Sequence, residues 1–208
     1  MDPLTTLTEI FKHFPGIGPR QAKRFVYYLL NQNPESLKKL TEQILALKKN
    51  VHQCISCFRY FNNNYNNRQN LCKICQDNSR DEGSLMLVER DIDLEAVEKA
   101  GTYRGRYFVL GGNIPILDKE PHKKIRESDL LRVINQKGQN LQELIIATSA
   151  NSEGDNTAEY LQNLLAEPAQ KYNFKISLLG RGLSTGSELE YADPETIKNA
   201  LTNRHTQN

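Results

Sequence analysis

The sequence lacks several features that would assign it to a common protein class. No stretch approaches the roughly 20 consecutive apolar residues that a membrane-spanning helix needs. Residues 1–14 have no basic start followed by an apolar run, so we expect no export signal and a cytoplasmic location. The phosphate-binding pattern G-x-x-x-x-G-K-[ST] is also absent, which excludes a P-loop nucleotide engine.

Cysteine is scarce and clustered. The chain has four cysteines, all within 22 residues, as Cys54-Ile-Ser-Cys57 and Cys72-Lys-Ile-Cys75. Two C-x-x-C turns at this spacing let four thiolates converge on one zinc ion, and a full set of protein ligands leaves no open coordination position. The sequence therefore predicts one structural zinc per chain, with two disulfides or a redox C-x-x-C as the alternatives.

What the sequence does contain is typical of a folded chain of 208 residues. Apolar residues make up 38 % and charged residues 25 %. The net charge of +2 hides a division, because residues 1–81 carry 12 basic and 6 acidic residues, a net of +6, whereas residues 82–208 carry 15 and 19, a net of −4. This asymmetry favours a polyanion-facing end and an end for basic partners, although two ordinary solvated surfaces would look the same.

The basic end predicts three helices. The first begins at Asp2-Pro3 and places Leu4, Leu7, Phe11 and Phe14 at helical spacing; the third covers roughly 36–49. The second follows Pro15-Gly16-Ile17-Gly18-Pro19, and its buried stripe is expected to contain Ala22, Phe25, Val26, Leu29 and Leu30.

Helix, Pro-Gly-Ile-Gly, helix is the pattern of a helix-hairpin-helix. Gly16 and Gly18 permit a tight turn and the close approach of a phosphate to backbone N–H groups at the start of the second helix. Arg20, Lys23 and Arg24 follow and add phosphate contacts, which read the DNA backbone rather than the bases. The alternative is a plain inter-helix turn beside a solvated basic face.

The acidic end predicts a mainly parallel sheet flanked by helices. Apolar runs at 84–89, 107–110, 144–147 and 175–179 alternate with helical patterns at 94–100 and 157–165. Glu89 ends the first run, and Glu153 and Asp155 follow another, so all three acids are expected at the carboxyl edge of the sheet. They are candidates for holding Mg²⁺; capping of a helix by Glu153, Asp155 or Thr157 is the alternative.

Taken in order, these motifs resemble the RecR family of bacterial recombination-mediator proteins. The resemblance rests on Phe14-Pro-Gly-Ile-Gly-Pro-Arg20, the four cysteines, the segments around Glu89, 101–105, 109–112 and 153–155, and the near-terminal Arg181-Gly-Leu183 with Leu189-Glu-Tyr-Ala-Asp193. It implies an α+β multi-module chain with four parts: a helix-hairpin-helix module (1–53), a C4 zinc finger (54–75), an α/β Toprim domain with a mainly parallel sheet (82–180) and a C-terminal helical segment (181–208).

The resemblance also implies a function. A family member is a non-enzymatic DNA clamp, a homodimer or homotetramer, that binds duplex or gapped DNA with RecO or RecF. It helps to load RecA recombinase at gaps coated by SSB, in RecBC-independent repair. On this interpretation Arg20, Lys23 and Arg24 face DNA, and the Toprim acids contact partner proteins; the alternative is a Mg-dependent Toprim nuclease or primase-like enzyme.

The sequence departs from the family pattern in three places. The gap between the two C-x-x-C turns is longer than usual and contains an Asn-rich tract (61–70), predicted to be a loop. Residues 113–121 replace a stretch that is normally richer in Gly. The acids at 153 and 155 are Glu and Asp, whereas Toprim topoisomerases and primases usually present two Asp at this spacing.

Overall fold

The computed structural model of the chain describes residues 2–62, 70–180, 182–183, 190, 192 and 194–202. These residues form two compact units, Met1–Val51 and His52–Asn208. Of the near-terminal signature, Arg181, Leu189, Tyr191 and Asp193 lie outside the described residues, as do residues 63–69 of the Asn-rich tract.

The first unit consists of the three predicted helices, α1 (Pro3–Lys12), α2 (Pro19–Leu30) and α3 (Pro34–Asn50). Each has proline in its first turn, where the missing N–H has no helical partner. The Asp2 side chain caps α1, and the Asn33 side chain caps α3 by accepting the N–H of Ser36. The Asn33 cap explains why α3 begins earlier than the predicted start near residue 36.

The core of the first unit is small, and part of the predicted buried stripe is wrong. Thr8, Ala22 and Val26 are buried, but Phe25 and Leu30 are 39 % and 63 % exposed. Phe14 lies beyond the end of α1 and is exposed as well. The reason is that α1 packs against α2, while α3 contributes no buried residue.

The second unit opens with the segment that carries the four cysteines, residues 54–75, which we call the cysteine segment. Strands β1 (Val51–Gln53) and β2 (Tyr60–Asn62) form a two-stranded sheet. The short helix α4 (Lys73–Gln76) begins at Cys72.

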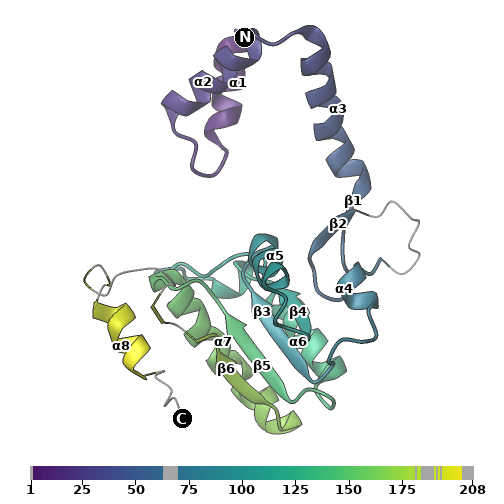
Figure 1. The fold of residues 1–208 in the computed structure, drawn as a ribbon, viewed down its shortest axis with the longest axis vertical. Helices are drawn as coiled ribbons and strands as arrows, with labels where there is room; N and C mark the ends of the chain where they lie inside the picture. Colours follow the sequence, from purple (N-terminus) through teal and green to yellow (C-terminus); the bar gives the residue numbers. More distant parts are fainter. Residues whose placement is uncertain are drawn as a thin grey trace. The chain divides into compact units, whose positions relative to one another are not determined.

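The rest of the second unit contains a four-stranded parallel sheet, as predicted. Its strands are β3 (Ser84–Val88), β4 (Arg106–Val109), β5 (Glu143–Ala147) and β6 (Lys175–Leu178), in the order β4-β3-β5-β6 (Figure 1). Every neighbouring pair is parallel, and Val88 lies opposite both Val109 and Ala147. The carboxyl ends of β3, β4 and β5 therefore meet at one edge.

The helices of the second unit are α5 (Asp91–Ala100), a 3-10 turn η1 (Pro121–Lys123), α6 (Glu127–Lys137), α7 (Ser152–Tyr172) and α8 (Pro194–Thr202). Helix α6 was not predicted, although Leu130, Val133 and Ile134 have helical spacing in the sequence and are buried. In the described part of the chain, no helix combines the length and apolar composition needed to cross a membrane.

Alternate residues of the strands build two separate cores. Leu85 and Leu87 of β3 belong to a cluster with residues of α6 and α7. Met86 and Val88, on the opposite face, belong to a cluster with Leu94 of α5 and with three of the cysteines. Because side chains alternate across a strand, α5 and the three buried cysteines cover one face of the sheet, while α6 and α7 cover the other, where Phe58 joins their cluster.

Candidate nucleic-acid interface and metal centre

The turn between α1 and α2 is exposed and held by glycine. Gly16 has φ of +74°, a left-handed conformation that side-chain-bearing residues rarely adopt. Gly18 is the N-cap of α2, and no heavy atom lies within 4 Å of where a Cβ at either glycine would stand. The outer surface of the turn is thus open to a ligand.

The start of α2 has backbone donors to offer. No side chain caps this helix, and Pro19 has no N–H. The N–H groups of the next residues, Arg20 and Gln21, precede the first intrahelical donor, which is Ala22 bonding to the Gly18 carbonyl at 3.0 Å. This arrangement suits an anion such as a phosphate.

The three predicted DNA-binding cations lie directly beside this start. Arg20, Lys23 and Arg24 are all exposed. Among the described residues, none of the three has an acidic group within 4.0 Å. Their charge is available to a polyanion.

The four cysteines come together as a candidate metal centre. The sulfurs of Cys54, Cys57, Cys72 and Cys75 all lie within 4.8 Å of one another, and Cys57 Sγ is 3.6 Å from Cys72 Sγ. Zinc–sulfur bonds of about 2.3 Å in a tetrahedron place the sulfurs about 3.8 Å apart, whereas a disulfide joins them at about 2 Å. The cluster is therefore close enough to hold a metal ion.

The local chemistry of the thiols fits the same conclusion. Cys54, Cys57 and Cys72 are buried, and the backbone N–H of Cys72 donates to Cys54 Sγ at 3.4 Å. Without a metal, the hydrogen bond between Cys54 and Cys57 lowers the pKa of the Cys54 thiol and raises that of the Cys57 thiol. A divalent metal would displace the protons that the cluster retains.

The cysteine segment is bonded directly to the sheet. The N–H of Val109 on β4 donates to the carbonyl of Cys57 at 2.8 Å, so the segment pairs with the outer strand of the sheet. The guanidinium of Arg106, also on β4, donates to the carbonyl of Ile74 at 2.7 Å. Both acceptors belong to the stretch between the first and last cysteine.

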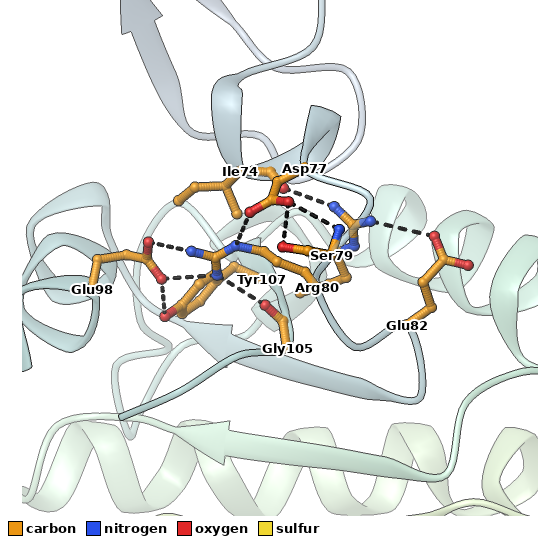
Figure 2. Close-up of polar contacts among 9 residues, drawn as sticks. Ile74, Asp77, Ser79, Arg80, Glu82, Glu98, Gly105 and Tyr107 are labelled. Atoms are coloured by element: carbon orange, nitrogen blue, oxygen red, sulfur yellow. Dashed lines mark hydrogen bonds and ion pairs between the residues drawn. The ribbon is translucent and has the colours of Figure 1, made fainter. Parts of the chain in front are cut away.

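A second arginine ties the segment after the cysteines to the sheet and to α5 (Figure 2). Arg80 donates to both carboxylate oxygens of Glu98, at 2.9 and 2.5 Å, and to the carbonyl of Gly105 at 3.1 Å. Tyr107 donates to Glu98 at 2.7 Å. Burial acts against the charged form of Glu98, yet these hydrogen bonds from Arg80 and Tyr107 hold its pKa below the ordinary value.

The three Toprim acids occupy the predicted edge of the sheet but have different roles there. Glu89 is buried, and its two oxygens accept from the N–H and hydroxyl of Ser149 at 2.9 and 2.8 Å. Glu153 is exposed and accepts from Asn113 at 3.0 Å. Asp155 is exposed on the same first turn of α7.

The side chain that caps α7 is a different one from those expected. Asn151 is the N-cap and accepts the N–H of Gly154, so capping by Glu153, Asp155 or Thr157 is wrong. Thr157 instead bonds to the carbonyl of Glu153 and accepts the N–H of Ile114. Over the described residues, the four cysteines form a close group of ligands, and Glu89, Glu153 and Asp155 do not form a second one. Magnesium binding by these acids stays a prediction.

Sequence reasoning missed the arginine networks. Arg80 and Arg106 meet partners that are 18 and 32 residues away in the chain. A weak signal existed for Arg106, because it is a charged residue directly before the apolar run 107–110. It is the first residue of β4 and is buried, and a buried charge needs a partner. Arg80 offers no comparable signal.

Together, the exposed glycine turn, the closed cysteine cluster and the parallel sheet define a helix-hairpin-helix protein with a metal-binding cysteine centre and a Toprim-type domain. Comparison with known families agrees with this class. Residues 4–48 match the family described as RecR, helix-hairpin-helix; residues 83–179 match the Toprim domain; residues 182–205 match RecR, C-terminal.

Relatives extend the match to almost the whole chain. The Recombination protein RecR of Chloroflexus aggregans is 37 % identical over 202 residues, which cover 97 % of this chain and 93 % of the relative. That of Magnetococcus marinus is 38 % identical, covering 94 % and 92 %, and that of Bdellovibrio bacteriovorus is 34 % identical, covering 97 % and 96 %. The chain belongs to the RecR family of recombination proteins, which supports a role in DNA repair and recombination.

Proposed function

We propose that the protein is a recombination mediator that binds the DNA backbone at the start of α2, without sequence preference. The observation that carries the proposal is the exposed turn at Gly16 and Gly18, beside three cations that have no acidic partner among the described residues. Backbone N–H groups and flexible cations together recognise phosphates whatever the base sequence. Such a site suits duplex or gapped DNA.

Charge reversal tests this site. The double variant Lys23→Glu and Arg24→Glu should lose at least tenfold in affinity for gapped DNA at about 100 mM salt, because phosphate contacts dominate binding. The matched control is Lys38→Glu with Lys39→Glu, which changes the charge of the same unit equally from exposed positions on α3. Equal loss in both variants would show a diffuse charge effect and contradict the proposed site.

We propose that the cysteine cluster holds one zinc ion per chain and that this ion is structural. Cys54, Cys57, Cys72 and Cys75 would be its four ligands, and a complete protein shell leaves no position for substrate. Elemental analysis of the purified protein should find one zinc per chain, falling below one tenth of that in the Cys54→Ser variant. A different metal at full stoichiometry would overturn the identity of the ion.

We propose that chains associate through the first unit, as a homodimer or homotetramer. Its apolar side chains exceed what its small core can cover, and Pro3, Leu4, Leu7, Val26, Leu29, Leu30 and Leu37 line a groove of about 280 Å³. Leu4→Glu with Leu7→Glu should reduce the mass measured by light scattering to that of one chain. Leu117→Glu, which alters a leucine that is 91 % exposed in the other unit, is the control. An unchanged mass in the Leu4 and Leu7 variant would contradict this interface.

We further propose that the protein acts in the cytoplasm with RecO or RecF to load RecA at gaps coated by SSB. The net charge of −4 over residues 82–208, with Glu153 and Asp155 exposed, suits a basic partner surface. Glu153→Lys with Asp155→Lys should weaken capture of RecO or RecF while DNA binding by α2 persists. Unchanged capture would remove these acids from the interface.

We propose that no catalytic step is involved. Ser149 engages both oxygens of Glu89, which favours a structural role for that carboxylate. Incubation of the protein with supercoiled, nicked and single-stranded DNA and Mg²⁺ or Mn²⁺ should leave the DNA unchanged. Nicking or synthesis that disappears in the Glu89→Gln variant would instead establish the alternative of a Toprim nuclease or primase.

A further inference from the structure

Helix α2 carries two exposed tyrosines in addition to its cations. Tyr27 and Tyr28 are 59 % and 63 % exposed, so neither ring belongs to the core of the first unit. Within the described residues, neither phenol hydroxyl has a hydrogen-bond partner. The side chains of Asn31 and Gln32 donate to the backbone carbonyls of the two tyrosines and not to their hydroxyls. Two large aromatic rings that are mostly exposed are therefore available to a ligand.

The tyrosines share their face with the proposed phosphate contacts. At about 100° per residue, Arg20, Lys23, Arg24, Tyr27 and Tyr28 fall within an arc of about 140° around the α2 axis. The buried Ala22 and Val26 lie on the opposite side of the helix. Tyr27 stands one turn beyond Lys23, and Tyr28 one turn beyond Arg24, so the face changes from cationic to aromatic along the helix.

The acids near this face are already engaged. Lys23 and Tyr27 line a groove of about 350 Å³ between α1 and α2 that also contains Asp2 and Glu9. Asp2 accepts the N–H groups of Leu4 and Thr5 at the α1 N-terminus, and Glu9 pairs with Lys12 at 2.8 Å. Their negative charge is therefore largely compensated within α1.

The cations and the rings on α2 correspond to two parts of an unpaired DNA strand: the cations at the start of the helix can bind a phosphate, and the rings further along can contact a base. The rings stand about 12 Å beyond the start of the helix, at about 1.5 Å per residue, and stacked bases repeat every 3.4 Å or so along DNA. A phosphate at the start of α2 and a base at the tyrosines can thus belong to one strand, about three or four nucleotides apart. A base inside a duplex is already stacked on both sides and has no face to offer, whereas an unpaired base has.

We propose that Tyr27 and Tyr28 stack on unpaired bases and direct α2 to single-stranded DNA, including the unpaired strand at a gap. This inference rests on the proposed DNA-binding function and names its substrate class. The cations supply affinity for any nucleic acid backbone, and the rings supply the preference for bases that lack a pairing partner. Neither contact reads the base sequence.

The test compares substrates rather than total binding. The double variant Tyr27→Ala and Tyr28→Ala should lose at least tenfold in affinity for single-stranded and gapped DNA, because one stacked base contributes about tenfold. Its affinity for blunt duplex should change by less than about twofold. Its salt dependence should stay unchanged, because a tyrosine releases no counterion. Phe at both positions should restore binding, and Leu at both should not, because only Phe keeps the ring.

Spectroscopy checks the contact itself. The fluorescence of a 2-aminopurine base placed in the gap should be quenched by the parent protein and by the variant with Phe at both positions. The variant with Leu at both positions should leave this fluorescence unquenched. Tyr60→Ala, which removes a ring that is 55 % exposed on β2, is the matched control and should behave like the parent. Because the probe reads the parent and the Phe variant directly, the result holds even where the Ala variant fails to fold.

The outcomes separate this inference from the function on which it rests. Charge reversal at Lys23 and Arg24 that removes binding to every DNA, combined with equal behaviour of the Leu and Phe variants, would retain the DNA-binding face and overturn base stacking. Retained binding after charge reversal would overturn the proposed function itself. A third outcome is that the Leu variant has a changed oligomeric mass and that the parent protein does not quench 2-aminopurine fluorescence. This outcome would show that the rings contact a second copy of the chain, and it would overturn the inference.

Discussion

At the scale of single residues, Gly154 is the position where the fold leaves least room. A Cβ at this residue would stand 2.0 Å from the backbone oxygen of Ser149, a distance that real structures do not show. The close approach lets Asn151 cap α7 and brings the loop of Ser149 against Glu89. A side chain at residue 154 would push this loop away from the carboxyl edge of the sheet.

Gly154→Ala should therefore lower the free energy of unfolding by about 1–3 kcal/mol, the usual cost of an added methyl group in a packed site. Gly180→Ala is the control, since no heavy atom lies within 4 Å of a Cβ there. Urea unfolding of both variants measures the difference. A Gly154→Ala loss no larger than that of Gly180→Ala would contradict the close packing.

The contribution of Glu98 to the stability of the fold should depend on pH. Its pKa is held below the ordinary value of 4.5, so its hydrogen bonds stabilise the folded state above that pH and the contribution is lost as pH falls through the lower, folded pKa. The difference in unfolding free energy between the parent and Glu98→Gln should thus shrink from about pH 6 to about pH 3. Glu167→Gln, at an exposed site, serves as the control in the same titration. A difference that stays constant across this range would contradict the paired state of Glu98.

At the scale of elements, β4 is the strand on which the cysteine centre depends. It is the outer strand of the sheet, and its free side is covered where the Val109 N–H bonds to Cys57 and Arg106 bonds to Ile74. An uncovered strand edge invites pairing with other chains. The cysteine centre thus braces the sheet as well as its own loop.

Metal removal should consequently destabilise the whole second unit. Chelation that strips the metal should lower the thermal midpoint by roughly ten degrees or more and promote aggregation, given the binding energy of structural zinc. Re-addition of zinc under reducing conditions should restore the midpoint. A protein freed of metal by elemental analysis that melts at the original temperature would contradict the bracing role.

The elements also show how far sequence patterns reach. The cysteine spacing, the four apolar runs and the Pro-Gly-Ile-Gly turn are local signals, and each corresponds to an element in the structure. Bonds such as Glu89 to Ser149 join residues 60 apart, and the order β4-β3-β5-β6 decides which of them meet. No local pattern encodes such pairs, which is why the arginine networks escaped prediction. The cap of α7 is a local contact between Asn151 and Gly154, but several residues near the start of α7 are able to cap a helix, and the pattern alone does not select among them.

At the scale of the whole molecule, the chain combines two kinds of surface. The first unit is basic around the start of α2 and has exposed apolar side chains on α1 and α2, which suits DNA and self-association. The second unit is well packed, and the first turn of α7 presents Glu153 and Asp155 to solvent. The predicted burial of Phe25 and Leu30 failed at this scale, because helical periodicity marks an apolar stripe but does not reveal whether the same chain or another copy covers it.

The most direct test of the central claim, that the start of α2 binds DNA phosphates, is the salt dependence of duplex binding. Each phosphate contact releases counterions and contributes about −0.9 to the slope of log affinity against log salt concentration. The triple variant Arg20→Ala, Lys23→Ala and Arg24→Ala should make that slope less steep by about 2–3. If the triple variant had the same slope as the parent protein, the claim would be contradicted.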